Sequence, residues 1–152
     1  MKLLIVVLLV VFLTPAHRIP ECVCIKEAHP SNEKIKADRK KAFDGATAVF
    51  EGEVVALDSY VVTFRLRKRW KGPSVGEVTL RTGAVAGYDG TPLPEECSYQ
   101  FQRGEAYLVY AYGEAEKMKT SICSTFKLQN ASEEEKGLDE IKAHSTVREK
   151  NP

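Results

Sequence analysis

The sequence predicts a mainly β domain, in which a five-stranded Greek-key barrel lies between an N-terminal and a C-terminal helix. Three observations support this fold class. Apolar residues alternate with polar ones through the middle of the chain, helix-capping residues occur on either side of that region, and four cysteines offer two covalent links. The chain has 152 residues, 43% of them hydrophobic, and this length suits one domain.

The charge of the chain is nearly balanced. There are 22 lysines and arginines against 21 aspartates and glutamates, which gives a formal net charge of +1. A protein that binds nucleic acid or an anionic membrane through its overall charge carries a large basic excess, which this chain lacks. The composition therefore points away from nucleic acid as a partner.

An uninterrupted apolar segment, Leu3 to Leu13, opens the sequence. It follows a lysine and precedes small residues, which is typical of a secretory signal peptide, and it is shorter than the roughly 20 residues of a membrane-spanning helix. We therefore expect a secreted protein without a membrane anchor. Cleavage after Ala16 suits the small-residue preference of signal peptidase, whereas cleavage after Glu21 would remove residues 1–21 and make Cys22 the first residue.

The cysteines are Cys22, Cys24, Cys97 and Cys123. In an oxidising compartment an even number predicts two disulfides. A bond between Cys22 and Cys24 would close a strained ring, so each of them is expected to pair with Cys97 or Cys123, in either combination. A thiolate zinc site is the alternative, but Cys-x-Cys without a second pair is poor zinc spacing, and we expect no resident metal or cofactor.

The first predicted element is a helix over residues 33–43. The stretch Pro30-Ser31-Asn32 before it supplies capping residues, and Asp44-Gly45 after it is a stop signal. Its expected buried stripe consists of Ile35, Ala42 and Phe43.

Five strands are predicted next, over residues 47–56, 60–70, 77–82, 106–112 and 120–125. In the second strand one face carries Tyr60, Val62, Phe64, Leu66 and Trp70. The fourth is apolar throughout, which suits burial on both faces, and the fifth carries Cys123. Residues 83–96 are rich in glycine and proline, so we expect a long exposed loop there.

The last predicted element is a helix that starts at the capping box of Ser132 and Glu133 to Glu135, with Leu138 and Ile141 facing inward. The domain is expected to span residues 22–145, followed by a flexible tail over residues 146–152. Five strands after an N-terminal tether favour a small barrel of the OB type.

Two faces are basic, and each allows two interpretations. They carry Lys34, Arg39, Lys40 and Lys41 on the first helix and Arg65, Arg67 and Arg69 on the second strand. These residues form either anion-binding surfaces, suited to sulfated glycans, or ordinary solvated faces.

Enzyme chemistry finds little support in the sequence. The three histidines show no metal-binding spacing and accompany no plausible nucleophile, and no glycine-rich phosphate loop is present. We therefore expect a binding protein and not an enzyme.

A set of short motifs recurs together in a defined order: Cys22-Val23-Cys24, Phe50-Glu51-Gly52, Trp70-Lys71-Gly72, Cys97-Ser98-Tyr99, Tyr107-Leu108-Val109 and Ile122-Cys123-Ser124. The chain resembles the netrin-like N-terminal domain of the tissue inhibitors of metalloproteinases, and most closely the short single-domain members. The resemblance runs from about Cys22 to Leu138. It implies an OB barrel, disulfides Cys22–Cys97 and Cys24–Cys123, and a wedge that enters a protease active site.

For the inhibitory members, the resemblance implies that the α-amine and carbonyl of Cys22 chelate the zinc of the target protease. Val23 would enter the primed-side pocket of that protease. The residues that would flank them at the contact are Cys24, Glu95, Glu96, Cys97 and Ser98. We expect a monomer that binds its target's zinc in trans.

The alternative is a non-inhibitory netrin-like module that binds extracellular glycans or proteins. Cleavage after Ala16 would favour it, because residues 17–21 would then precede Cys22 and convert the free amine into a poorly chelating amide. Asn130-Ala131-Ser132 is a glycosylation sequon, which is used only in a glycosylating host.

Overall fold

The structure is a computed structural model, and it describes residues 22, 24, 27–74, 76–95 and 97–150. The predicted signal peptide, Val23 and Glu96 lie outside the described residues. The elements are α2 (Asn32–Gly45), β1 (Ala48–Leu57), β2 (Val61–Lys71), β3 (Glu77–Arg81), β4 (Ala84–Ala86), β5 (Pro92–Pro94), β6 (Ala106–Ala111), β7 (Thr125–Lys127), the 3₁₀ helix η1 (Leu128–Asn130) and α3 (Ser132–Lys150).

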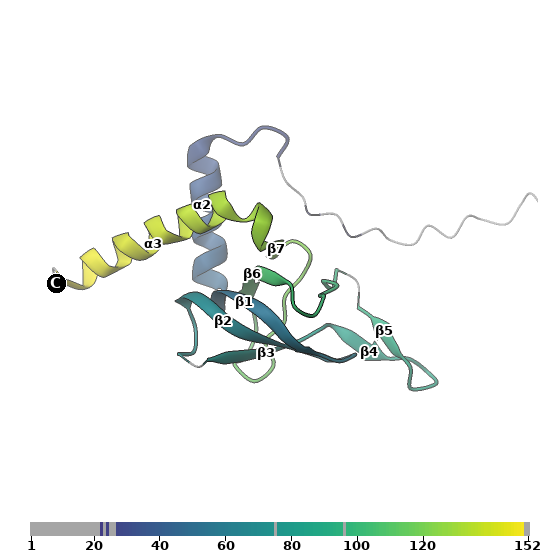
Figure 1. Ribbon diagram of the computed structural model, residues 1–152. Helices are drawn as coiled ribbons and strands as arrows, with labels where there is room; N and C mark the ends of the chain where they lie inside the picture. Colours follow the sequence, from purple (N-terminus) through teal and green to yellow (C-terminus); the bar gives the residue numbers. More distant parts are fainter. Residues whose placement is uncertain (1–21, 23, 25–26, 75, 96, 151–152) are drawn as a thin grey trace, which may run out of the picture.

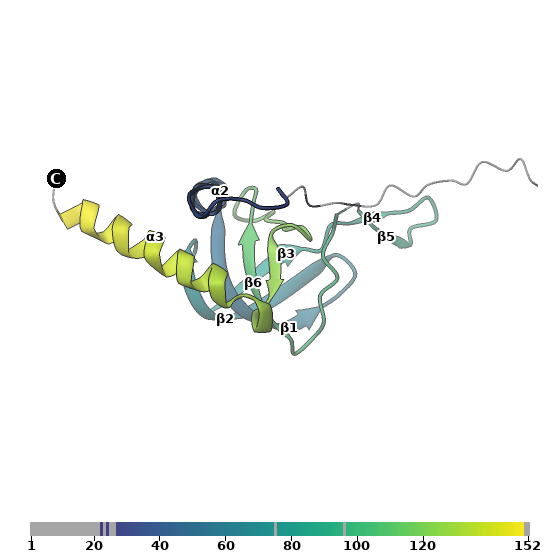
Figure 2. The ribbon, with the colours of Figure 1, turned by 90° about the horizontal axis from the view of Figure 1, so that it is seen from above.

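Five of the strands form one antiparallel sheet in the order β3-β2-β1-β6-β7. The helices α2 and α3 cross over one face of this sheet (Figures 1 and 2). The β4–β5 hairpin forms a second, two-stranded sheet, and in both views it projects from the end of the molecule opposite the C-terminal end of α3. The predicted mainly β class, with one helix before the strands and one after them in the sequence, is therefore confirmed.

Two apolar clusters occupy the two faces of the sheet. One lies on the face away from the helices and includes Phe50, Phe64 and Tyr107. The other, between the sheet and the helices, includes Leu108 and Leu138. Because consecutive residues of β6 contribute to opposite clusters, this strand is buried on both faces, as its unbroken apolar sequence predicts.

The prediction that Trp70 shares a face with Phe64 is wrong. The pairing of β1 with β2 is irregular between Leu66, which lies opposite Gly52, and Lys68, which lies opposite Glu51. Such a bulge shifts the alternation by one residue and turns the following side chains to the other face. Trp70 therefore packs on the helix side, where its indole nitrogen donates a hydrogen bond to α3.

The predicted strand over residues 120–125 is also wrong, because the last strand is β7 and starts only at Thr125. Hydroxyl groups explain the difference. The Thr120 hydroxyl donates to the Tyr110 carbonyl at 2.9 Å, and the Ser124 hydroxyl accepts from the Ser121 backbone N–H at 3.0 Å. Side chains that bond to nearby backbone in this way favour turns over strands.

The long loop predicted over residues 83–96 contains the β4–β5 hairpin, so the expectation of an irregular segment is wrong in part. The ladder pairs Ala84 with Pro94 and Ala86 with Pro92. An Asp-Gly pair at the tip, Asp89-Gly90, is a recognised turn signal that could have identified this hairpin.

The helices differ from expectation at two points. None of the residues of α2 is buried; Ala42 and Phe43 are partly covered, but Ile35 is exposed, because only the C-terminal part of α2 reaches the core. In α3, Leu138 is fully buried as predicted. The helix continues to Lys150, so most of the predicted tail is helical.

Candidate functional site at the disulfide-linked N-terminal segment

Two disulfides attach the N-terminal segment to the body of the domain. Cys22 is bonded to Cys97 and Cys24 to Cys123, across 75 and 99 residues of sequence. This is the pairing that the family resemblance implies, and it leaves no free cysteine among the described residues for the alternative zinc site. In the chain-entropy model each bond of this span stabilises the fold by about 4.5 kcal/mol.

The anchor of the first disulfide, Cys97, has an unusual backbone conformation. Its φ of 65° lies in the left-handed region, and it is the only non-glycine residue with positive φ in the part of the chain that the structure describes. This conformation costs on the order of 1–3 kcal/mol unless the surroundings enforce it. The Cys97 carbonyl accepts from the Ile122 N–H at 3.0 Å, and the Ser98 N–H donates to the Glu95 carbonyl at 3.1 Å.

These hydrogen bonds connect the two disulfides. Ile122 precedes Cys123, so the backbone around one anchor cysteine is bonded directly to the backbone around the other. Because Cys22 and Cys24 each take one of these anchors, the short segment between them is held at both ends by one hydrogen-bonded unit.

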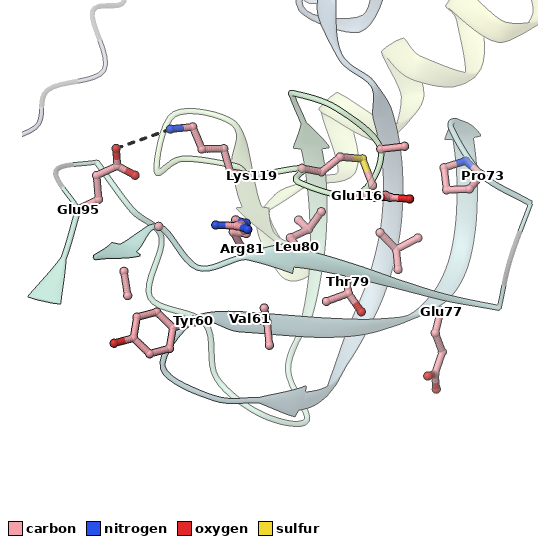
Figure 3. A pocket seen from close by; sticks show the side chains of 15 residues that line it. Tyr60, Val61, Pro73, Glu77, Thr79, Leu80, Arg81, Glu95, Glu116 and Lys119 are labelled. Atoms are coloured by element: carbon pink, nitrogen blue, oxygen red, sulfur yellow. Dashed lines mark ion pairs between the residues drawn. The ribbon is translucent and has the colours of Figure 1, made fainter. Parts of the chain in front are cut away.

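Gly83 lets the chain pass close to this unit. Its φ is +82°, and a Cβ at this position would lie 3.1 Å from the Cβ of Ser98. The Gly83 carbonyl accepts from the Glu95 N–H at 2.9 Å. The Glu95 carboxylate in turn forms an ion pair with Lys119 at 3.6 Å (Figure 3). Among the predicted protease-contact residues, Glu95, Cys97 and Ser98 thus lie together beside Cys22 and its bond.

A cleft of about 670 Å³ runs from this region along the edge of β3. Figure 3 shows Glu95 and Tyr60 at one end and Pro73 and Glu77 at the other. Sequence reasoning did not find this cleft, because it lies between β3 and a segment near residue 119 that is far away in the sequence.

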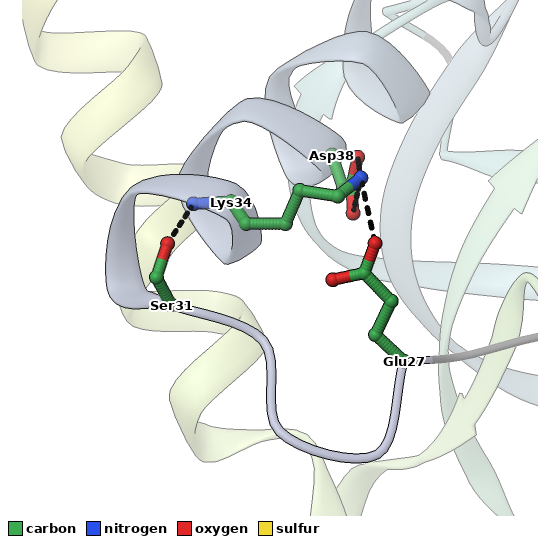
Figure 4. A network of polar contacts seen from close by, with 4 residues as sticks. All are labelled: Glu27, Ser31, Lys34 and Asp38. Carbon is green, nitrogen blue, oxygen red and sulfur yellow. Dashed lines mark hydrogen bonds and ion pairs between the residues drawn. The ribbon is translucent and has the colours of Figure 1, made fainter.

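The predicted basic faces are largely neutralised by acidic partners. On α2, Lys34 bonds to Asp38 at 3.0 Å and also lies 4.0 Å from Glu27 (Figure 4). Hydrogen bonding to Asp38 raises the pKa of Lys34. Ion pairs also join Lys40 to Asp44, Arg39 to Glu134, Arg65 to Glu77 and Arg67 to Glu53.

The other two predicted cations differ from these. Arg69 donates to the Gly72 carbonyl at 2.8 Å. The side chain of Lys41, on α2, forms no ion pair or hydrogen bond with the residues that the structure describes. The structure thus brings most of these cations to acidic or carbonyl oxygens, which favours the interpretation of solvated faces.

A second polar cluster lies under α2, in a cleft of about 790 Å³ between that helix and the sheet. The Glu134 carboxylate accepts from Arg39 Nε at 3.0 Å and from the Tyr110 hydroxyl. Burial, together with this hydrogen bond, raises the pKa of Tyr110 well above its ordinary value. Both acceptor oxygens of Glu134 are engaged, so this cluster joins α2, α3 and β6 and has the character of a structural tie.

Within residues 22, 24, 27–74, 76–95 and 97–150, no three His, Cys, Asp or Glu side chains gather as a metal site would require. None of the helices described combines the length and apolar character needed to cross a bilayer. Asn130 of the predicted sequon is exposed at the end of η1.

No protein-family model matches the chain, and no curated protein sequence matches it.

Proposed function

We propose that this protein is a secreted inhibitor of zinc metalloendopeptidases that acts through the N-terminal amine of Cys22. One observation carries the proposal. The Cys-x-Cys segment is bonded at both cysteines to a strained, hydrogen-bonded unit around Cys97 and Cys123. A purely stabilising staple needs only one bond to fix this terminus, whereas two bonds two residues apart fix the direction of the segment as well.

The chemistry follows from a free amine on Cys22. An α-amine has an ordinary pKa of about 7.7–8.0, so a neutral lone pair is available at modest cost near neutral pH. The amine nitrogen and the carbonyl oxygen of the same residue can close a five-membered chelate on a catalytic zinc. That chelate would displace the zinc-bound water, which is the nucleophile of hydrolysis.

Rigidity is the contribution of the fold to this chemistry. A segment that is ordered before binding avoids an entropic cost of roughly 0.5–1.5 kcal/mol for each side chain that would otherwise become immobilised. Val23 follows Cys22 directly and would occupy the primed-side pocket, with Glu95, Glu96 and Ser98 at its border.

For the architecture, we propose that the sheet closes into a barrel of the OB type. The support comes from Lys119, which forms a parallel bridge with Arg81 of β3 and an antiparallel bridge with Tyr112, next to β6. A short segment that contacts both strands in this way links β3 to β6, which lie on either side of β1 and β2 in the open sheet.

The experiment compares proteins that differ only at the N-terminus. One begins at Cys22, a second carries a single alanine before Cys22, and a third begins at His17. Each is checked for both disulfides by mass spectrometry and assayed against a panel of zinc metalloendopeptidase catalytic domains with a fluorogenic peptide. We expect the protein that begins at Cys22 to inhibit at least one protease, and the extended proteins to be at least about 100-fold weaker because an amide nitrogen cannot chelate.

Besides an absence of inhibition by the protein that begins at Cys22, two results would refute the proposal. The first is inhibition that does not depend on the added alanine. The second is the finding, by N-terminal sequencing of the secreted protein, that His17 is its stable first residue.

A further inference from the structure

Exposed apolar side chains are concentrated at the disulfide end of the molecule. Among the described residues, the large exposed hydrophobic side chains are Ile35, Leu57, Tyr60, Tyr88, Leu93 and Ile122. Ile35, on α2, lines the cleft under that helix together with Cys123, whereas the other five lie outside that cleft. Single exposed hydrophobic residues are normal on a protein surface, whereas a group of them around one feature marks an interaction site.

Each of the other five is connected to Cys97 or to the chain next to it. Ile122 donates its backbone N–H to the Cys97 carbonyl. Tyr60 lines one cleft together with Glu95, and Leu57 lines a neighbouring cleft together with Ser98. The remaining two belong to the β4–β5 hairpin, which ends one residue before Glu95.

Tyr88 is the most exposed of these side chains, because it stands fully in solvent at the tip of the hairpin. The turn that carries it is well ordered by hydrogen bonds. The Gly87 N–H donates to the Thr91 carbonyl at 2.7 Å, and the Asp89 carboxylate accepts from the Thr91 N–H at 3.0 Å and from its hydroxyl at 2.6 Å. The aromatic ring is thus presented to solvent by a rigid turn and not by a loose loop.

The hairpin is also attached firmly to the proposed site. At its base Ala84 pairs with Pro94, and the next residues continue through the hydrogen bonds that join Gly83, Glu95 and Ser98. Three further residues of extended chain separate this base from the tip, which corresponds to roughly 10 Å. Tyr88, in the turn between β4 and β5, therefore stands roughly 10 Å beyond the base of the hairpin. Figure 1 shows this hairpin projecting from the body of the domain.

We propose that the β4–β5 hairpin is a second docking element for the target protease, with Tyr88 binding the protease surface outside its catalytic cleft. This inference rests on the proposed inhibitory function. A stable complex between an inhibitor and a protease buries about 800 Å² on each partner. A chelating N-terminus alone covers less than that, so the inhibitor needs a further contact surface. Tyrosine suits the role of anchor because it offers a large contact area with few rotatable bonds.

The test compares exposed apolar residues on two different elements, the β4–β5 hairpin and α2. Tyr88→Ser is made in the protein that begins at Cys22, and Ile35→Ser in α2 is the matched control. The inhibition constant and the dissociation rate are measured against a protease that the parent protein inhibits. We expect Tyr88→Ser to raise the dissociation rate by about 10- to 100-fold and Ile35→Ser to leave it within about twofold.

A second variant, Tyr88→Phe, removes the hydroxyl group but keeps the aromatic ring. It should keep the inhibition constant within about threefold, because ring area provides most of the contact. Parent-like dissociation of the Tyr88→Ser protein would overturn this inference and leave the proposed function intact. Absence of inhibition by the parent protein would overturn both.

Discussion

Gly137 lies inside α3, at a position where helix propensity alone favours alanine by about 1 kcal/mol. The structure gives a reason for the glycine. A Cβ at this position would lie 2.0 Å from Nη1 and 2.3 Å from Cζ of Arg39, so the guanidinium rests directly on the backbone of α3. Arg39 reaches this place from α2 and is held there by Glu134.

The expected effect of Gly137→Ala is the difference between two opposing terms. The gain in helix propensity is about 1 kcal/mol. Against it, the methyl group must displace the guanidinium from Glu134, which is only 20% exposed, and a hydrogen bond to a charged partner in such a place contributes about 1.5–3 kcal/mol. The net change is a loss of about 0.5–2 kcal/mol in the free energy of unfolding.

A double-mutant cycle tests this reasoning through the sign of the effect. In the Arg39→Ala background the clash is absent, so Gly137→Ala should raise the free energy of unfolding by up to about 1 kcal/mol. Urea unfolding followed by fluorescence of the single tryptophan measures all four proteins. The reasoning is refuted if Gly137→Ala stabilises the protein equally in both backgrounds.

Three further predictions concern the sheet and the site. A hydrogen bond from Lys68 lowers the pKa of Asp139 in the folded protein. The stabilisation by this carboxylate is therefore complete above the ordinary aspartate pKa near 4 and is lost as the pH falls through the lower folded pKa. The difference in the free energy of unfolding between the parent and Asp139→Asn, measured by urea unfolding, should shrink below pH 4. Trp70→Phe removes a 2.7 Å hydrogen bond to Asp139 and should lower the free energy of unfolding by about 1 kcal/mol, measured by circular dichroism; no loss would show that this bond contributes nothing. Gly83→Ala places a methyl group against Ser98 on a backbone with positive φ. It should lower the free energy of unfolding by about 1–3 kcal/mol and therefore the melting temperature. An unchanged melting temperature would contradict the expected strain.

The parts of the fold that could be predicted are those in which local pattern and tertiary contact agree. The unbroken apolar run of β6 is buried on both faces because helices cover one side of the sheet and the aromatic cluster covers the other. α3 starts at Ser132, where the sequence predicts a helix start, and the Ser31 hydroxyl accepts a hydrogen bond from the Lys34 N–H at the start of α2. In each case residues a few positions apart carry the whole signal.

The parts that failed depend on residues far apart in sequence. Trp70 changes face because β1 and β2 pair with a bulge. Lys68 interrupts the apolar row of this strand in the sequence, but this interruption alone does not specify a bulge. The residues before β7 form a turn instead of a strand, and one of the hydrogen bonds that hold them runs from the Thr120 hydroxyl to the Tyr110 carbonyl, ten residues away. For the candidate site, the cysteine spacing identified the anchors, but the contribution of Lys119 and Gly83 appears only when the chain has folded.

The distribution of charge and apolar surface separates two parts of the molecule with different roles. At the helix end, cations meet carboxylates across elements, as in the pairs Arg39–Glu134 and Lys68–Asp139, and this end buries Trp70 and Leu138. At the end that carries Cys97, an ion pair joins Glu95 to Lys119, but apolar side chains such as Tyr88 stay exposed. Folding stability alone would favour burying those side chains and leaving the backbone of Cys97 unstrained. Their combination is the pattern expected of a surface that is completed by a partner, which is why the inhibitory hypothesis places the partner there and not on the paired basic faces.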